Sequence, residues 1–493
     1  MKLNHHPRPI RRRVIRPELI LLSAFHFALL IMIARREISI MSTSNLGLAL
    51  NSMAINILQG RFDVDPNSIL YEGFDRDGRT YAYFGILPAL LRLPLLPFID
   101  LSTVQVEGPM RYAAMVIAAI GTLKIVEQLA EMFPESHAHD FLVGILVRAA
   151  IFSGPPILLS LRWDIYNEVT LWAWAFASWF VAAAWPLLRA GSNATTGRLI
   201  WLVALSGLCL LTRPTTGIGL LLATGLLTIV LMLEPRGGQQ AGAFTRFLLA
   251  IREVRFLLPA ALALLFILAA GGVNYARWDN PFTFADMRAQ TEQIRLFPDR
   301  LDRLDRYGLF NLDRLWLGLS YYFLPLWAIS WNGRLLFQED ASRLVDALEL
   351  PPSSFFLTDP MTVVLAAIGG VALLRQSLPQ VAPGRAIAIL AGLTFAPTLM
   401  LVAWFMSFRY RVEFMPLFFV LAGLGALRVA NWFPSASERR RRVVLATLVF
   451  LLVVQIISAH LYAILYGASP YGPSDPYADN GFAAFYAGIL GRR

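Results

Sequence analysis

Two aspartates stand close together in a polar stretch near the start of the chain, GRFDVDPNSILYEGFDRDGRTYAYFG. Asp63 and Asp65 are two residues apart and precede Pro66, so in an extended backbone both carboxylates point to the same side. Such a pair predicts a general base for an incoming hydroxyl group or a site for a divalent cation, Mg²⁺ or Mn²⁺. The alternative is an exposed turn, because Asp and Pro are ordinary turn residues.

Arginines stand where apolar runs end, namely Arg213 in LTRPTTG, Arg277 in NYARWDN, and Arg409 and Arg411 in SFRYRVEF. Arginine near a membrane boundary is costly unless it is paired or bound to an anion, and its planar fork suits phosphate oxygens. Several such arginines on one face predict a site for a lipid phosphate or pyrophosphate. Snorkelling to headgroups, or pairing with acids such as Glu413, is the alternative for each one.

A third group of polar residues lies in SLRWDIYNEVTLW, at the start of an apolar run. Asp164 and Glu168 are four residues apart and share one face of a helix. They predict contact with an acceptor hydroxyl or with an arginine. A helix cap at Asp164, followed by a favourable acid in the first turn, explains both residues nearly as well.

Several common catalytic motifs do not occur in the sequence. There is no P-loop, no GxGxxG opening a helix, no HExxH and no GxSxG, so nucleotide-driven transport, dinucleotide chemistry, zincin hydrolysis and the usual serine nucleophile have no support. The six histidines form no external ligand set. The single cysteine, Cys209, lies in an apolar run, which excludes a disulfide framework.

Composition indicates that the chain lies in a membrane. Its 493 residues are 57% hydrophobic and 15% charged, and one water-soluble core cannot hide that much apolar surface. Apolar runs of roughly 17 to 23 residues recur from end to end, and this length spans a bilayer. The sequence therefore predicts an all-α polytopic membrane protein with about eleven crossings. The expected spans are 18–34, 112–131, 141–161, 169–188, 199–211, 216–233, 256–273, 361–374, 386–404, 414–427 and 443–465.

Arginine-rich connections between these runs set the expected orientation. The positive-inside rule places them in the cytoplasm together with the N-terminus. The formal charge of +10 is then a topology signal, and nucleic-acid binding is not expected. The basic connections are 189–198, 236–255, 375–385 and 428–442.

Two apolar stretches, 81–99 and 316–331, are interrupted by proline or rich in aromatic residues. If both crossed the membrane, the count would rise to about thirteen. If both are interfacial or re-entrant segments, every strong basic loop lies on the same face of the membrane. A backbone interrupted by proline is tolerated at membrane depth where protein or water lines it. We therefore expect them not to cross, so that the polar segments gather on the external face.

The expected organisation is a single transmembrane domain over 1–493. A first external loop with juxtamembrane helices is expected at 35–80, a large external region at 274–360 and an external tail at 466–493. Within the large external region, 288–314 alternates Asp and Arg, which predicts a short surface helix with ion pairs along it.

The order of the polar motifs resembles the bacterial polytopic glycosyltransferases of the GT-C superfamily. The motifs run GRFDVDP, DGRTYAYFGILPALLRLPL, WDIYNE, LTRPT, NYARWDNPFTF, GLFNLDRLWLGLSYYFLPLW and FRYRVEFMPLF, over about 51–416. There are no paired prolines at the juxtamembrane site and no WWDYG-like signature, so the resemblance does not assign a branch of the superfamily.

The resemblance implies an inverting transferase that moves a sugar from a polyprenyl-phosphate carrier to a lipid, glycan or protein acceptor. Its active site would lie on the periplasmic face of the bacterial inner membrane. The catalytic acid of the first loop matches Asp63 and Asp65, without deciding between them. The candidate substrate-binding residues are Tyr81, Tyr83, Asp164, Glu168, Arg213, Arg277, Arg409, Arg411 and Glu413.

Two other functions remain open from the sequence. A transporter or flippase of lipid-linked sugars typically has inverted repeats or ionisable residues near the bilayer midplane. A polysaccharide polymerase or ligase typically has a large external loop with arginines and a histidine, and 288–314 has arginines but no histidine.

Overall fold

The chain is an all-α membrane protein. The computed structural model describes residues 15–35, 43–134, 139–161, 164–235, 242–325, 330–331, 334–335, 337–349, 353–468, 484–485, 487–488 and 491. Within them, eight helices are long and apolar enough to cross a membrane. They are α5 (Glu107–Ala130), α6 with α7 (His139–Ile151 and Gly154–Leu161), α8 (Ile165–Leu188), α10 (Pro214–Leu233), α12 (Val254–Trp278), α19 with α20 (Pro383–Leu393 and Phe395–Leu401), α21 (Met415–Trp432) with its flanking turns, and α22 (Glu438–Ala468).

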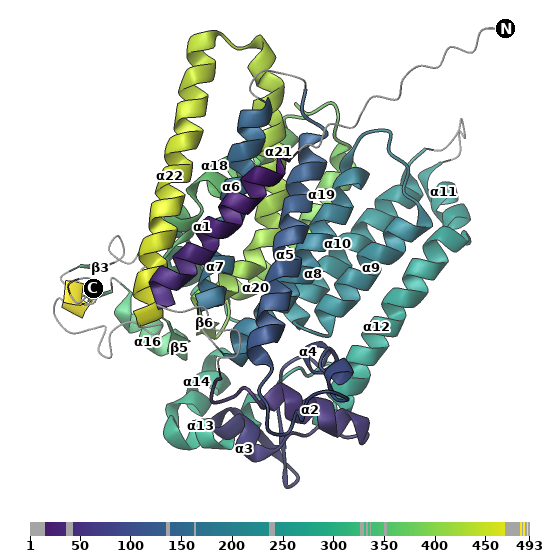
Figure 1. Ribbon diagram of the computed structural model, residues 1–493. Helices are drawn as coiled ribbons and strands as arrows, with labels where there is room; N and C mark the ends of the chain where they lie inside the picture. Colours follow the sequence, from purple (N-terminus) through teal and green to yellow (C-terminus); the bar gives the residue numbers. More distant parts are fainter. Residues whose placement is uncertain are drawn as a thin grey trace.

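Three shorter apolar helices complete the bundle in Figure 1. They are α1 (Pro17–Arg35), α9 (Thr196–Leu210) and α18 (Pro360–Leu374). Each packs on a long neighbour, α1 on α22, α9 on α12 and α18 on α21. Helices α18 and α21 approach closely because Gly369 and Gly425 face the partner backbone, where a Cβ atom would collide. Together the long and shorter helices correspond to the spans expected from the sequence.

Neither of the two interrupted stretches forms a crossing helix in the residues that the structure describes. The first contains α4 (Leu87–Leu90) and the turn η2 (Leu93–Leu95), and the second contains α15 (Leu315–Phe323). Proline limits the first stretch, since a proline inside a helix removes a backbone donor. The lower expected count of crossings therefore fits these residues better than the higher one.

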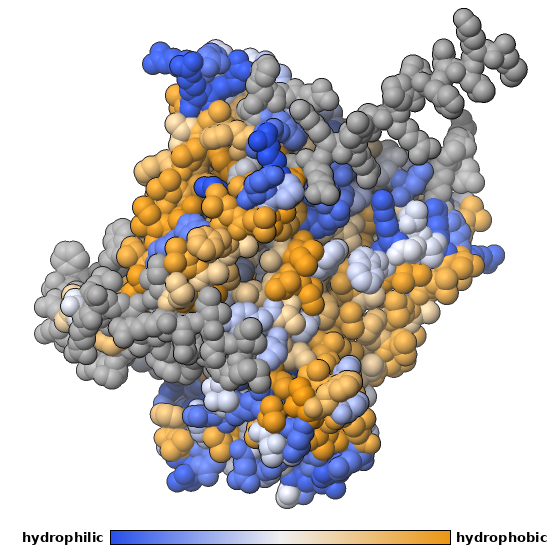
Figure 2. Space-filling model, in the orientation of Figure 1, coloured by the Kyte–Doolittle hydropathy of each residue, from blue (hydrophilic) through white to orange (hydrophobic). Residues whose placement is uncertain are grey.

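The two ends of the bundle differ in polarity. Figure 2 shows an apolar belt between two hydrophilic ends. At one end, which we call the basic end, the Arg-rich connections are cross-linked, with Arg385 Nε 2.6 Å from Glu234 Oε1 and Arg189 Nη2 3.0 Å from Glu131 Oε2. The other end, which we call the polar end, carries the long loops.

The first loop builds one half of the polar end. Its elements are α2 (Ala49–Leu58), α3 (Pro66–Ile69), η1 (Leu70–Glu72), β1 (Phe74–Arg76) and β2 (Arg79–Tyr81). Strands β1 and β2 are antiparallel, with Phe74 opposite Tyr81. Asp77 and Gly78 join them with φ of 50° and 72°, the conformation that an Asp-Gly hairpin turn requires.

The second loop builds the other half. It contains η3 (Met287–Ala289), α13 (Thr291–Leu296), α14 (Asp299–Tyr307), η4 (Leu312–Arg314), β3 (Ser330–Trp331), β4 (Arg334–Leu335), α16 (Gln338–Leu344), β5 (Ala347–Leu348) and α17 (Phe355–Thr358). Helix α14 is the surface helix expected from the Asp and Arg alternation, and Asp299 pairs with Arg303 one turn later. Most of the expected C-terminal tail lies outside the described residues.

Candidate functional site

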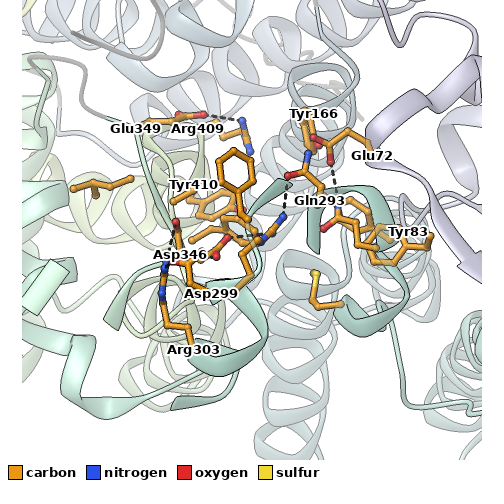
Figure 3. Close-up of a pocket in the computed structure, with 18 residues that line it drawn as sticks. Glu72, Tyr83, Tyr166, Gln293, Asp299, Arg303, Asp346, Glu349, Arg409 and Tyr410 are labelled. Carbon is orange, nitrogen blue, oxygen red and sulfur yellow. Dashed lines mark hydrogen bonds and ion pairs between the residues drawn. The ribbon is translucent and has the colours of Figure 1, made fainter. Parts of the chain in front are cut away.

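A cavity of about 420 Å³ lies at the polar end, where the two loops meet the ends of the bundle helices. Its volume falls in the range of small-molecule sites, roughly 300 to 1,000 Å³. Figure 3 shows the side chains that point into it. The lining residues are Glu72, Phe74, Tyr83, Tyr166, Met287, Gln290, Gln293, Phe297, Asp299, Arg300, Arg303, Asp346, Ala347, Leu348, Glu349, Phe405, Arg409 and Tyr410.

Short pairings between distant segments hold this lining together. Strand β5 runs parallel to β6 (Phe405–Met406), with Ala347 opposite Phe405. On either side of this pairing, Asp346 N donates to Trp404 O and Glu349 N donates to Met406 O, each at 3.0 Å. The pairing thereby brings the end of the second loop beside η6 (Phe408–Phe414), which carries Arg409.

Glu72 is the acid that the first loop contributes to the cavity. Its Oε2 accepts a hydrogen bond of 3.1 Å from Gln290 Nε2, and Figure 3 shows it beside Tyr166. Within the described part of the chain Glu72 forms no ion pair. A carboxylate that an amide holds in place at a cavity is a candidate general base on geometric grounds.

Arg409 brings positive charge to the same cavity. Its Nη1 lies 3.0 Å from Glu349 Oε1, and its guanidinium lies 4.5 Å from the centre of the Tyr166 ring. Tyr410 lies next to it, and the guanidinium of Arg213 is 5.1 Å from the Tyr410 ring. Stacking on Tyr166 and pairing with Glu349 hold the planar fork of Arg409 in one orientation at the cavity.

One side of the cavity is formed by α13, α14 and the residue before β5, and we call it the far wall. It consists of Gln293, Phe297, Asp299, Arg300, Arg303 and Asp346. Arg300 lies 3.1 Å and Arg303 lies 3.5 Å from the Asp346 carboxylate. Burial raises the pKa of Asp346, and these two arginines oppose that shift. The far wall is therefore a row of paired charges, in contrast to the lone carboxylate of Glu72.

Of the residues singled out from the sequence, Tyr83 and Arg409 line the cavity. Asp63 and Asp65 do not. Asp63 is 7% exposed and pairs with Arg61 at 2.9 Å. Asp65 caps α3, its Oδ1 accepting from Asn67 N at 2.9 Å.

These two aspartates fit a divalent cation poorly. The guanidinium of Arg61 already compensates Asp63, and one oxygen of Asp65 serves the helix cap. In the residues that the structure describes, no group of three or more His, Cys, Asp or Glu could hold a metal ion. The aspartate pair is therefore a poor match to the Mg²⁺ or Mn²⁺ site that its spacing predicts.

Asp164 and Glu168 hold the polar end together. Asp164 Oδ1 accepts from Asn167 N at 2.7 Å and caps α8. Glu168 is fully buried and binds Arg92 in a bidentate pair of 2.8 and 2.7 Å. Arg92 follows α4, so this ion pair ties the interrupted stretch 81–99 to the bundle. The expectation that Glu168 contacts an arginine is met by Arg92.

The other candidates pack around the cavity without lining it. Tyr81 packs on Trp278, with ring centres 5.8 Å apart. Arg277 is buried and donates to Phe84 O at 2.9 Å, and Arg411 is buried and donates to Ser353 and Thr358. Glu413 accepts from Arg213 and from two threonine hydroxyls, Thr215 and Thr216. The pairing of Arg213 with Glu413 is the structural alternative that the sequence allowed.

Six charged residues of the cavity were not among the candidate site residues named from the sequence. They are Glu72, Asp299, Arg300, Arg303, Asp346 and Glu349. The Asp and Arg alternation in 288–314 marked α14 as charged, but it did not indicate that Arg300 and Arg303 turn towards Asp346. No local pattern marks Glu72, Asp346 or Glu349, because long-range pairing places them.

No family model matches the sequence, and no curated protein matches it. Solved structures similar to this chain include the Archaeoglobus fulgidus oligosaccharyltransferase in the apo form, at 13% identity and a TM-score of 0.49, covering 92% of this chain and 56% of that chain. The same archaeal enzyme, AglB, in complex with an inhibitory peptide and a dolichol-phosphate has 13% identity, a TM-score of 0.46 and the same coverage.

ArnT from Cupriavidus metallidurans bound to undecaprenyl phosphate is also similar, at 11% identity and a TM-score of 0.44, covering 92% of this chain and 77% of that chain. The chain spans about half the length of the oligosaccharyltransferase, 56%. At such identities the likeness is one of fold alone.

Proposed function

We propose that this chain is a GT-C-type glycosyltransferase that moves a sugar from a polyprenyl-phosphate carrier to an acceptor hydroxyl group. The observation that supports it is the meeting of three segments in one cavity at the polar end. The first loop supplies Glu72, the second loop supplies the far wall, and η6 supplies Arg409. Transfer of a sugar from a lipid phosphate requires a base for the acceptor hydroxyl and a cation for the departing phosphate, close to one another.

The reaction is a single displacement. The acceptor oxygen attacks the anomeric carbon of the sugar while the bond from that carbon to the phosphate oxygen breaks. Glu72 takes the proton of the acceptor hydroxyl, and the carrier leaves as polyprenyl phosphate. Attack opposite to the leaving group inverts the anomeric configuration.

Arg409 is assigned to the carrier phosphate in this proposal. Its guanidinium faces the cavity and is fixed by Glu349 and Tyr166. Negative charge grows on the phosphate as the bond breaks, so a fixed cation stabilises the transition state more than the ground state. Arg213, on the ring of Tyr410, adds to the positive potential behind Arg409.

Glu72 is preferred over Asp63 and Asp65 as the base. It lines the cavity and has an amide as its hydrogen-bond partner, whereas Asp63 pairs with an arginine and Asp65 caps a helix. All three belong to the first loop, so the proposal keeps the acid in the segment that the sequence motifs indicated.

The orientation follows from the distribution of arginine. The basic end would face the cytoplasm together with the N-terminus. The cavity would then lie on the periplasmic face of a bacterial inner membrane, where lipid-linked sugars and their acceptors meet.

The test uses the full chain, purified and reconstituted in vesicles. Polyprenyl-phosphate sugars are supplied with a cell-envelope extract as acceptor, and release of polyprenyl phosphate is measured together with sugar transfer. The expected result is stoichiometric release and transfer for at least one donor. Movement of an intact lipid-linked sugar across the bilayer without cleavage would overturn the proposal and favour a flippase.

A further inference from the structure

The far wall differs in chemistry from the part of the cavity that holds Glu72 and Arg409. We infer that the far wall is a binding subsite for uncharged sugar rings, so that the acceptor is a glycan. This inference rests on the proposed function, because it assigns the acceptor of that same reaction. Three independent features of the far wall support it.

The first feature is an alternating row of planar donors and acceptors. Arg300 donates to Gln293 Oε1 at 2.9 Å and lies 3.1 Å from Asp346 Oδ2. Arg303 lies 3.5 Å from the other Asp346 oxygen and pairs with Asp299 at the next position in the row. Sugar hydroxyls both donate and accept, and neighbouring hydroxyls match the two-pronged geometry of guanidinium and carboxylate groups.

The second feature is an aromatic surface next to this row. Phe297 follows α13 and is 54% exposed although it lines the cavity. Phe405 lines the same region, beneath the guanidinium of Arg300 at 5.6 Å. An exposed aromatic ring gains when an apolar face covers it, and the C–H face of a sugar ring provides such a face beside its hydroxyls.

The third feature is charge balance. The far wall contains two arginines, Arg300 and Arg303, and two acids, Asp299 and Asp346. Because each charge already has a partner of opposite sign, an uncharged ligand can bind without leaving a buried charge unpaired. A uronic acid or a peptide terminus would add a charge that this wall does not compensate.

The test measures binding without a donor, so that it does not depend on turnover. Saturation-transfer NMR is recorded on the full chain in lipid nanodiscs with three probes: neutral hexose oligosaccharides, uronic-acid oligosaccharides and a peptide containing Asn-X-Thr. The expected result is binding of the neutral oligosaccharides. Binding of the peptide or of the uronic acids in their place would overturn the inference.

Variants then locate the subsite. Phe297→Ala and Arg300→Gln are expected to weaken oligosaccharide binding by about tenfold or more. Their matched controls are Leu296→Ala and Arg295→Gln, adjacent or nearby residues that do not line the cavity. Phe297 is exposed, so its replacement does not threaten folding. Unchanged binding in both cavity variants would overturn the inference.

Failure of this inference is distinguishable from failure of the proposed function. If neutral oligosaccharides bind the far wall but no sugar transfer occurs with any donor, the subsite stands and the transferase proposal fails. If transfer occurs while Phe297→Ala and Arg300→Gln keep the wild-type KM for the acceptor, the transferase stands and the glycan subsite fails.

Discussion

Glu72 and Gln290 meet across the cavity, with 3.1 Å between Oε2 and Nε2, although 218 positions separate them in the chain. Beside them, Thr291 donates to Asp75. These two contacts join the first and second loops at the cavity, and an amide from the second loop holds the carboxylate of the first. This arrangement fixes the position of Glu72 without neutralising it.

Replacement of Glu72 by Gln keeps the size of the side chain and removes the proton acceptor. We expect sugar transfer to decrease by about 10² to 10⁴-fold, the usual contribution of a general base, with little change in the KM for the donor. The measurement is the initial rate of transfer in vesicles. Glu292→Gln, on the surface of α13 and paired with Arg295, is the control and keeps the wild-type rate.

Asp63→Asn and Asp65→Asn distinguish Glu72 from the other acids of the first loop. Both variants are expected to retain transfer, because neither side chain lines the cavity. A rate lost in either aspartate variant and kept in Glu72→Gln would return the role of base to the aspartate pair.

The spans were predictable from the sequence because the signal for each is local. An apolar run of sufficient length has few alternatives to a membrane helix, and the described helices follow the expected runs. Arg409 and Tyr83 could also be predicted from the sequence, because both stand at the border of an apolar run, where the polar functional groups of a membrane protein are expected.

The remainder of the site was not predictable, because contacts between distant segments create it. Asp346 and Glu349 reach the cavity only through the pairing of β5 with β6, a contact of two residues on each side. Conversely, the spacing of the acid pair in the first loop suits an extended backbone, and Asp65 is extended, but its side chain caps α3 and Asp63 pairs with Arg61. Sequence spacing describes an isolated segment and does not describe how two loops close on each other.

Arg409→Gln tests whether Arg409 binds the phosphate group of the carrier. Loss of one fixed donor to a developing charge costs about 10² to 10³-fold in rate, and we expect a decrease of this size in kcat/KM together with a higher KM for the donor. Arg409→Lys keeps the charge and loses the planar fork, so it should recover only part of the activity. Arg295→Gln is the surface control, and an unchanged KM for the donor in Arg409→Gln would contradict the assignment.

The ion pair of Arg92 and Glu168 is expected to act on stability. Both side chains are fully buried, and loss of one partner leaves an uncompensated charge at a cost of about 3 to 5 kcal/mol. Glu168→Gln should therefore lower the thermal unfolding temperature and the yield of folded protein. The double variant Arg92→Met with Glu168→Leu leaves no charge unpaired and should recover stability. If Glu168→Gln is fully stable and raises the KM for the acceptor, Glu168 contacts substrate instead.

The raised pKa of Asp346 predicts that the stability of the fold depends on pH. Burial raises its pKa above the ordinary value of 3.8, so at pH values between the ordinary and the raised pKa the folded protein holds a proton that the unfolded chain has released. Stability then falls as the pH rises through that interval. Thermal unfolding from pH 3.5 upwards (about the ordinary pKa of Asp) should show this decrease in the wild type and a smaller one in Asp346→Asn. If the unfolding temperature decreases equally with pH in the wild type and in Asp346→Asn, Asp346 is not the source of the pH dependence.

The orientation in the membrane is testable with single cysteines, because the natural background is low. Cys209 is the one cysteine of the sequence and is buried in the bundle, so it should react slowly with an impermeant maleimide. Asp65 lies exposed at the polar end and Arg440 lies exposed in the first turns of α22, at the basic end. Asp65→Cys should label in intact spheroplasts, whereas Arg440→Cys should label only after the membrane is permeabilised. The opposite pattern would place the cavity in the cytoplasm, where it could not meet a periplasmic acceptor.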